Sequence, residues 1–248
     1  MLVTNGCSFT WGDELDGYEE NKHHHLTFAY QLAEKLGIEY ENLATCGACN
    51  HKIFRDTIDY IRKHDNITHM VIIWSAWQRD EVSESHPPKY EDNMKIQRWQ
   101  CQTQISPSRL HFTHKKLLDV LDPYYKVVNV ERNGIIKTLS YMHAIGTLCE
   151  VKGIKLLQGG FHERMWVNYL DCFTKFHNKG KNWGEYNLWV KAQMDDLPDH
   201  YRIGLGKYVD LFKLAREKYS IKPFGHPDES THEEYAHLLH HIFMSTYK

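Results

Sequence analysis

The sequence predicts an α/β protein built on a parallel sheet. Over residues 2–74, three segments with strand character alternate with segments of helical periodicity. A strand-helix-strand order of this kind favours parallel strands joined by right-handed crossovers. The third strand, residues 70–74, is apolar throughout, as expected for a buried strand. The chain has 248 residues, 42% of them hydrophobic, which suits one sizeable domain, 1–248.

The elements of the first third follow from short local signals. Residues 2–4 are β-prone, and Gly6 lets the chain turn sharply after them. Thr27 is the expected N-cap of a helix that stops at Gly37 and carries one apolar face, formed by Phe28, Leu32, Ala33 and Leu36. A second strand is expected over 38–44. The next helix begins near Asn50 and His51, and its buried face is formed by Ile53, Ile58 and Ile61.

The rest of the chain alternates between regular elements and two insertions. Residues 80–112 are polar and contain prolines, which predicts a long loop of the kind that is usually functional or an assembly contact. A helix from about 123 to 152 and a fourth strand over 154–158 are expected next. The second insertion, 159–206, is rich in aromatic residues that suit sugar faces but that could equally pack against one another. Helices are expected over 209–219 and 231–244.

Ser8 is the first candidate for chemistry, because it follows the first strand. Open parallel α/β sheets bind their ligands at this edge, although serines after strands are also common turn and cap residues. His226 stands just before the last expected helix, where it could serve as a general base for an N-terminal serine.

Three short blocks together resemble the SGNH (GDSL-like) hydrolase superfamily. Gly6-Cys7-Ser8 matches the block that holds the family's nucleophilic serine, and Gly47 matches its oxyanion-hole glycine. The last block has the family's order of histidine, proline, second histidine and helical alanine, at His226, Pro227, His232 and Ala236. The resemblance covers both ends of the chain and the strand pattern but not the middle third. Its first two blocks look like those of members met in large phage genomes, which implies a viral protein.

The resemblance implies a three-layer α/β/α sandwich with a central parallel sheet, of the flavodoxin-like SGNH-hydrolase type. It implies a serine esterase acting on O-acyl groups, with O-acetyl groups of a carbohydrate as the leading substrate. Ser8 would be the nucleophile and His226 the base, and the backbone amides of Ser8 and Gly47 would hold the oxyanion. Asn50 in the second block is a candidate substrate ligand. No metal or organic cofactor is required.

Two departures from the family bear on activity. The third block, residues 71–81, lacks the family's oxyanion asparagine, and Gln78 or a backbone amide could take its place. The family's triad aspartate would stand at the position of Pro223. Either His226 works in a dyad, or a carbonyl or a remote carboxylate orients it, or the site is no longer hydrolytic. The last case would make the chain a binding or virion-associated protein that keeps the fold.

Other side chains carry rival predictions. Arg79 follows the third strand and would bind a substrate carboxylate or phosphate at the pocket mouth, or pair with Asp80 or Glu81 at the surface. Cys46 and Cys49 form a C-x-x-C pair near His51, which suggests redox chemistry or half of a zinc site. The alternative is that both cysteines simply pack the turn around Gly47. The other cysteines are isolated in sequence, and a structural zinc site needs four ligands.

Composition limits the partners. A net charge of -2 and an isoelectric point near 6.8 give none of the basic excess of a general nucleic-acid binder. No apolar run approaches the ~20 residues of a membrane span, and no signal peptide is apparent. We therefore expect a cytoplasmic protein, in the host cell or virion if it is viral. Its partner is expected to be a small-molecule or glycan ester, with no nucleic acid and no membrane, and the sequence does not indicate an oligomeric state.

Overall fold

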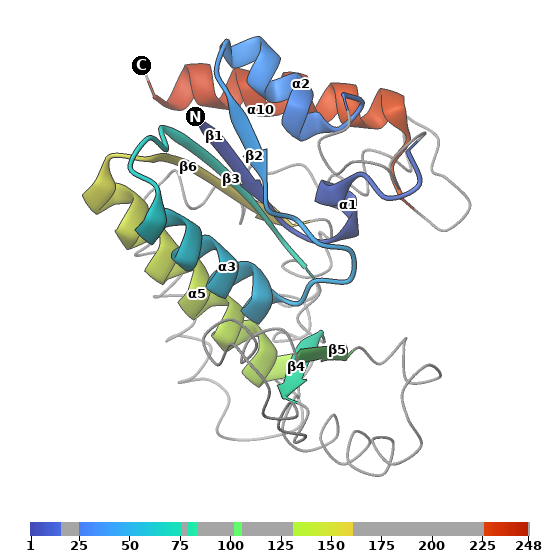
Figure 1. The fold of residues 1–248 in the computed structure, drawn as a ribbon, viewed down its shortest axis with the longest axis vertical. Coiled ribbons are helices and arrows are strands. Elements are labelled where there is room, and N and C mark those ends of the chain that lie inside the picture. The colour runs from blue at the N-terminus through green and yellow to red at the C-terminus, as the bar shows by residue number, and fades with distance from the viewer. Residues whose placement is uncertain (16–24, 76–78, 84–101, 106–130, 161–225, 248) are drawn as a thin grey trace, which may run out of the picture.

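The computed structural model describes residues 1–15, 25–75, 79–83, 102–105, 131–160 and 226–247. Within them a parallel sheet is formed by four strands: β1 (Leu2–Asn5), β2 (Tyr40–Asn42), β3 (His69–Trp74) and β6 (Lys155–Gly160). One face is covered by α2 (Phe28–Leu36) and α10 (Glu229–Thr246), which pack together; the other is covered by α3 (Asn50–Lys63) and α5 (Glu131–Lys152) (Figure 1). The predicted three-layer α/β/α sandwich with a central parallel sheet is confirmed.

The strand order places a ligand-binding edge beside β1. The order is β2-β1-β3-β6, so Thr4 of β1 pairs with Asn42 on one side and with Val71 on the other. The chain moves outward from β1 to β2 and then returns across β1 to β3. Because crossovers are right-handed, this reversal puts the connecting helices on opposite faces. The carboxyl ends of β1 and β3 therefore flank a topological switch point, where α/β sheets bind ligands.

The helix boundaries agree with the capping signals. The Thr27 side chain accepts a hydrogen bond from the Tyr30 backbone N–H at 3.3 Å, and Gly37 ends α2 with φ 66°. Gly153 ends α5 with φ 68°, and Asp228 caps α10 by accepting from the Thr231 N–H at 3.0 Å. Glycine at C′ and a short oxygen-bearing side chain at the N-cap each satisfy end groups that the helix leaves unpaired.

β3 is buried, as its apolar sequence predicts. Trp74 is fully buried, and its indole N–H donates to Gln158 Oε1 at 2.9 Å. The Gln158 amide in turn donates to the carbonyl of Met142 at 3.0 Å. This chain of hydrogen bonds satisfies the polar atoms within the core and joins β3 to β6 and α5.

Two features differ from the sequence prediction. β2 is shorter than 38–44 because its only partner among the described strands is β1, and their pairing ends at Thr4 and Asn42. The predicted loop 80–112 contains two strands, β4 (Asp80–Ser83) and β5 (Gln102–Ile105), paired antiparallel. Their polar sequences show no clear alternation, which is why the sequence did not indicate them. Several predicted segments lie outside the described residues. They are the helix over 209–219, the start of the helix from 123 and most of both insertions.

Candidate active site

Ser8 is the first residue of a one-turn helix, α1 (Ser8–Trp11), that follows β1 directly. The turn closes on the carbonyl of Cys7, which accepts from the N–H groups of Thr10 and Trp11 at 3.0 and 2.9 Å. Gly6 is required before it, because a Cβ there would collide with the Thr10 side chain and lie 2.9 Å from the Ile73 carbonyl oxygen. This close approach to β3 turns the chain so that Ser8 sits at the carboxyl edge of the sheet. Ser8 is 6% exposed.

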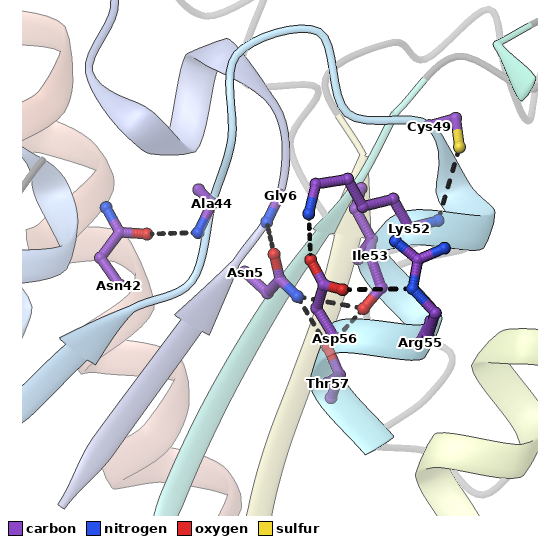
Figure 2. A network of polar contacts seen from close by, with 10 residues as sticks. All are labelled: Asn5, Gly6, Asn42, Ala44, Cys49, Lys52, Ile53, Arg55, Asp56 and Thr57. Atoms are coloured by element: carbon purple, nitrogen blue, oxygen red, sulfur yellow. Dashed lines mark hydrogen bonds and ion pairs between the residues drawn. The ribbon is translucent and has the colours of Figure 1, made fainter. Parts of the chain in front are cut away.

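Asn5 fixes the end of β1 just ahead of this turn (Figure 2). Its side-chain amide donates to the Ile53 carbonyl at 3.0 Å and to Thr57 Oγ1 at 2.9 Å, both on α3. Its side-chain oxygen accepts from the Gly6 N–H at 2.8 Å. The amide is buried, so all three bonds form where water cannot compete for them. The strand end that carries Ser8 is thus tied to α3.

His226 reaches the same place from the other end of the chain. Its Nε2 lies 2.9 Å from Ser8 Oγ, although 218 positions separate the two residues. The imidazole side chain is 14% exposed, and the Phe9 ring packs beside it with centroids 5.0 Å apart. Asp228 holds the start of α10 directly after it. The structure therefore brings together the two residues that the sequence singled out.

A carboxylate that the sequence did not indicate completes this group. Glu14 Oε2 lies 2.6 Å from His226 Nδ1 and accepts from the His226 backbone N–H at 3.3 Å. Asp13 Oδ2 lies 3.6 Å from His226 Nε2. Pro223, which stands where the family has its aspartate, lies outside the described residues. The only available signal was the Asp13-Glu14 pair close behind Ser8, and local sequence patterns do not predict contacts between distant segments.

The turn after α1 aims Glu14 at His226. Gly12 ends the helix with φ 90°, and the N–H groups of Gly12 and Asp13 both donate to the Ser8 carbonyl at 3.0 Å. Leu15 is 1% exposed and donates its N–H to the Gly12 carbonyl at 3.2 Å. Glu14 itself has φ 68°, a left-handed conformation that costs a non-glycine residue about 1–2 kcal/mol. The hydrogen bonds of Gly12 and Asp13 on one side, and the burial of Leu15 on the other, hold Glu14 in this conformation.

We expect Gly12→Ala to destabilise the protein more than Gly37→Ala. Both glycines have positive φ, so both substitutions cost about 1–2 kcal/mol in backbone energy. A Cβ at Gly12 would also lie 2.7 Å from Thr27 Cγ2, whereas one at Gly37 would meet nothing within 4 Å. Crowding of this kind adds about 1–3 kcal/mol. Chemical denaturation should therefore give a larger loss of unfolding free energy for Gly12→Ala, and equal losses would contradict the crowding.

Gly47 lies in a tight turn beside the Ser8 segment. The Ala48 N–H donates to the Thr45 carbonyl at 3.0 Å and Gly47 has φ 77°, as at the third position of a type II turn. The Thr45 N–H donates to the Gly6 carbonyl at 3.2 Å, which ties this loop to the chain just before Ser8. Within the described residues, the N–H groups of Ser8 and Gly47 donate no hydrogen bond.

The other predicted site residues have different surroundings. Asn50 is 4% exposed, and its side chain accepts from the Ser75 N–H at 2.7 Å and donates to the Ser75 carbonyl at 3.0 Å and to Thr138 Oγ1 at 2.9 Å. These bonds join α3 to the end of β3 and to α5.

Arg79 is half-buried, and its Nη1 has no hydrogen-bond partner in the described part of the chain. Asp80, a predicted partner of Arg79, forms an ion pair with Lys137 at 2.8 Å. Gln78 lies outside the described residues.

The C-x-x-C pair has a structural role at one of its two cysteines. Cys49 is buried and caps α3, its sulfur accepting from the Lys52 N–H at 3.4 Å (Figure 2). His51 stacks on Tyr141 with ring centroids 5.9 Å apart. Neither Cys46 nor Cys49 forms a disulfide with another described cysteine. Where the structure describes the chain, no three His, Cys, Asp or Glu side chains are grouped so as to hold a metal ion.

Three kinds of comparison with known proteins were informative to different degrees, and none gives this chain a family. No family model and no curated protein sequence matches the chain. A solved structure, described as "a putative lipolytic protein of G-D-S-L family" from Desulfitobacterium hafniense DCB-2, aligns with 97% of this chain and 98% of its own at 10% identity and a TM-score of 0.49. None of the helices in the described ranges has the length and apolar character needed to cross a membrane.

Proposed function

We propose that this protein is a serine hydrolase that cleaves O-acyl esters, with Ser8 as nucleophile and His226 as general base. The observation that carries the proposal is the 2.9 Å separation between Ser8 Oγ and His226 Nε2. An alcohol is a weak nucleophile until a base within hydrogen-bond reach can take its proton. The position of Ser8 at the switch point of the sheet gives it the usual place of a ligand-binding residue in this fold class.

The reaction would proceed through an acyl-serine. Ser8 Oγ attacks the ester carbonyl while its proton passes to His226 Nε2, and the resulting imidazolium returns that proton to the leaving alcohol. A water molecule then attacks the acyl-serine with His226 again as base, which releases the carboxylic acid and restores Ser8. These steps use only the two side chains and water.

The backbone amides of Ser8 and Gly47 are our candidates for the oxyanion hole. Neither N–H donates a hydrogen bond to another described residue, which supports both as donors to an oxyanion. The positive φ of Gly47 and its link through Thr45 to Gly6 support its placement beside the serine. Preformed donors of this kind are typically worth about a hundredfold to a thousandfold in rate each. A third donor in place of the family's asparagine is not required for the proposal.

We propose O-acetyl groups, with those of carbohydrates first, as the substrates to examine. The support is the resemblance of the three sequence blocks to SGNH hydrolases, together with the aromatic composition of 159–206. Aromatic rings offer sugars an apolar platform. A viral source and a cytoplasmic location remain predictions from the sequence.

The test is labelling by an alkyl fluorophosphonate, which reacts with activated serines. We expect the folded protein to be labelled once, on the peptide that contains Ser8, and we expect no labelling of Ser8→Ala or His226→Ala. Denatured protein is the control for nonspecific reaction. A folded wild type that is not labelled would favour the alternative of a binding protein that keeps the fold without the chemistry.

A further inference from the structure

Two carboxylates from one turn face the two nitrogens of the His226 ring. Glu14 Oε2 is 2.6 Å from Nδ1, and Asp13 Oδ2 is 3.6 Å from Nε2, the nitrogen that also faces Ser8 Oγ at 2.9 Å. Among the described residues, these are the carboxylates that pair with the ring. Their unequal geometry indicates different roles.

We infer that Glu14 replaces the aspartate that Pro223 has displaced, so that Ser8, His226 and Glu14 form a triad. This inference rests on the proposed function. Glu14 contacts His226 and would act through its ring, which makes it a positioning residue.

The contact with Nδ1 fixes the proton on the correct nitrogen. A carboxylate at Nδ1 accepts the N–H there, which leaves the lone pair of Nε2 directed at Ser8 Oγ. Glu14 also accepts the His226 backbone N–H, so one carboxylate oxygen holds both the ring and the main chain of the same residue. When His226 takes the serine proton, the negative charge of Glu14 stabilises the imidazolium.

Asp13 does not meet the same requirements. Its distance of 3.6 Å is beyond an ordinary hydrogen bond, and it faces the nitrogen that must accept the proton of Ser8. A proton held between Nε2 and Asp13 would remove the base that the reaction needs. Asp13 is also more exposed than Glu14, with 24% against 13% of the side chain accessible, so solvent screens its charge more.

The backbone conformation of the turn is a second observation that supports a role for Glu14. Glu14 is the described non-glycine residue with positive φ, and strain of this kind is typically retained at functional sites. The turn from Ser8 to Leu15 is closed by hydrogen bonds to the Ser8 carbonyl and by the burial of Leu15. The nucleophile and its positioning carboxylate therefore come from one hydrogen-bonded turn, and His226 contacts both from the far end of the chain.

The matched test compares Glu14→Gln with Asp13→Asn, since each removes one negative charge beside the same ring. We expect Glu14→Gln to lower kcat for a short-chain aryl acetate by about 10³–10⁴-fold, with KM within a few fold. We expect Asp13→Asn to lower kcat by less than about tenfold, because it does not set the tautomer. Glu14→Asp, which keeps the charge on a shorter side chain, should fall between wild type and Glu14→Gln.

Proton NMR gives a readout that needs no turnover. A strongly downfield Nδ1 proton, assigned by its absence from His226→Gln, should be present in wild type, Ser8→Ala and Asp13→Asn, and should be lost or shifted upfield in Glu14→Gln. An unshifted proton in folded Glu14→Gln, or a larger loss of kcat in Asp13→Asn, would overturn the inference. If wild type shows neither hydrolysis nor probe labelling, the proposed function fails, while the NMR comparison still decides whether Glu14 holds His226.

Discussion

Replacing His226 with alanine is expected to lower kcat for hydrolysis of a short-chain aryl acetate by about 10⁴–10⁶-fold. The reason is geometric: Nε2 of His226 is the base 2.9 Å from Ser8 Oγ, and no other described histidine contacts that oxygen. Ser8→Ala should cost as much, because members of a nucleophile-base pair act as a unit and their losses do not add. The double variant should therefore be no slower than either single variant.

The matched control is His237→Ala. His237 lies on α10, the helix that follows His226, and its side chain is 56% exposed and contacts Glu233 and Lys35 at the surface. We expect its kcat and KM to stay within about twofold of wild type, in line with the small effects of surface substitutions. Loss of activity in His237→Ala comparable to that in His226→Ala would show that the assay reports damage to α10 and not loss of a base.

The second large effect is a loss of folding stability at acidic pH, which we attribute to His232. Burial lowers the pKa of His232 from 6.5 to about 3, outweighing the attraction of Glu229 and Asp228. The ring is fully buried, stacks on Phe28 and accepts the Phe28 backbone N–H through Nδ1 at 3.2 Å. The neutral ring therefore carries its proton on Nε2, which has no hydrogen-bond partner in the described structure.

The His232 ring thus binds its second proton near pH 6.5 in the unfolded chain, whereas in the folded chain it does so only near pH 3. Between these values the unfolded state holds more protons, so the stability present above pH 6.5 is lost as the pH falls through this window. At 1.36 kcal/mol for each pKa unit, the full loss from this residue is on the order of 5 kcal/mol. Urea unfolding of the wild type at a series of pH values should show the decline.

His232→Asn isolates this contribution, because its side-chain oxygen can still accept the Phe28 N–H but does not titrate. We expect the variant to be less stable than wild type at pH 7 and to lose less stability between pH 6.5 and 4. His69, whose pKa burial lowers to about 4, contributes a slope of the same sign to both proteins and cancels in the comparison. Parallel curves for the two proteins would mean that His232 is not the residue responsible.

The fold was predictable because its signals are local. Thr27 and Gly37 bound a helix whose apolar face repeats at helical spacing, and the apolar run at 70–74 forms a buried strand. The structure also shows Asp228 as the N-cap of α10 and Gly153 at the end of α5, which are the usual positions of these residue types. Each of these depends on residues within a few positions of one another, where propensity and periodicity decide the structure.

The site was predictable only in part. Ser8 and His226 could be paired through block order alone, but Glu14 could not, because its role depends on a turn held by Gly12 and Leu15. Asn50 was a predicted substrate ligand, yet the structure shows its amide joined to Ser75 and Thr138. A polar side chain at a sheet edge gives the same sequence signal whether it faces a ligand or satisfies the backbone beside it.

The central claim is that Ser8 carries the acyl group, and trapping that intermediate tests it most directly. Wild type is mixed with a short-chain aryl acetate, quenched in acid during turnover, digested and analysed by mass spectrometry. We predict one acetyl group on the peptide that contains Ser8, assigned to its side chain by fragmentation and absent from Ser8→Ala. Hydrolysis without an acetylated intermediate, or an acetyl group on Cys7 or another residue in place of Ser8, would contradict the account.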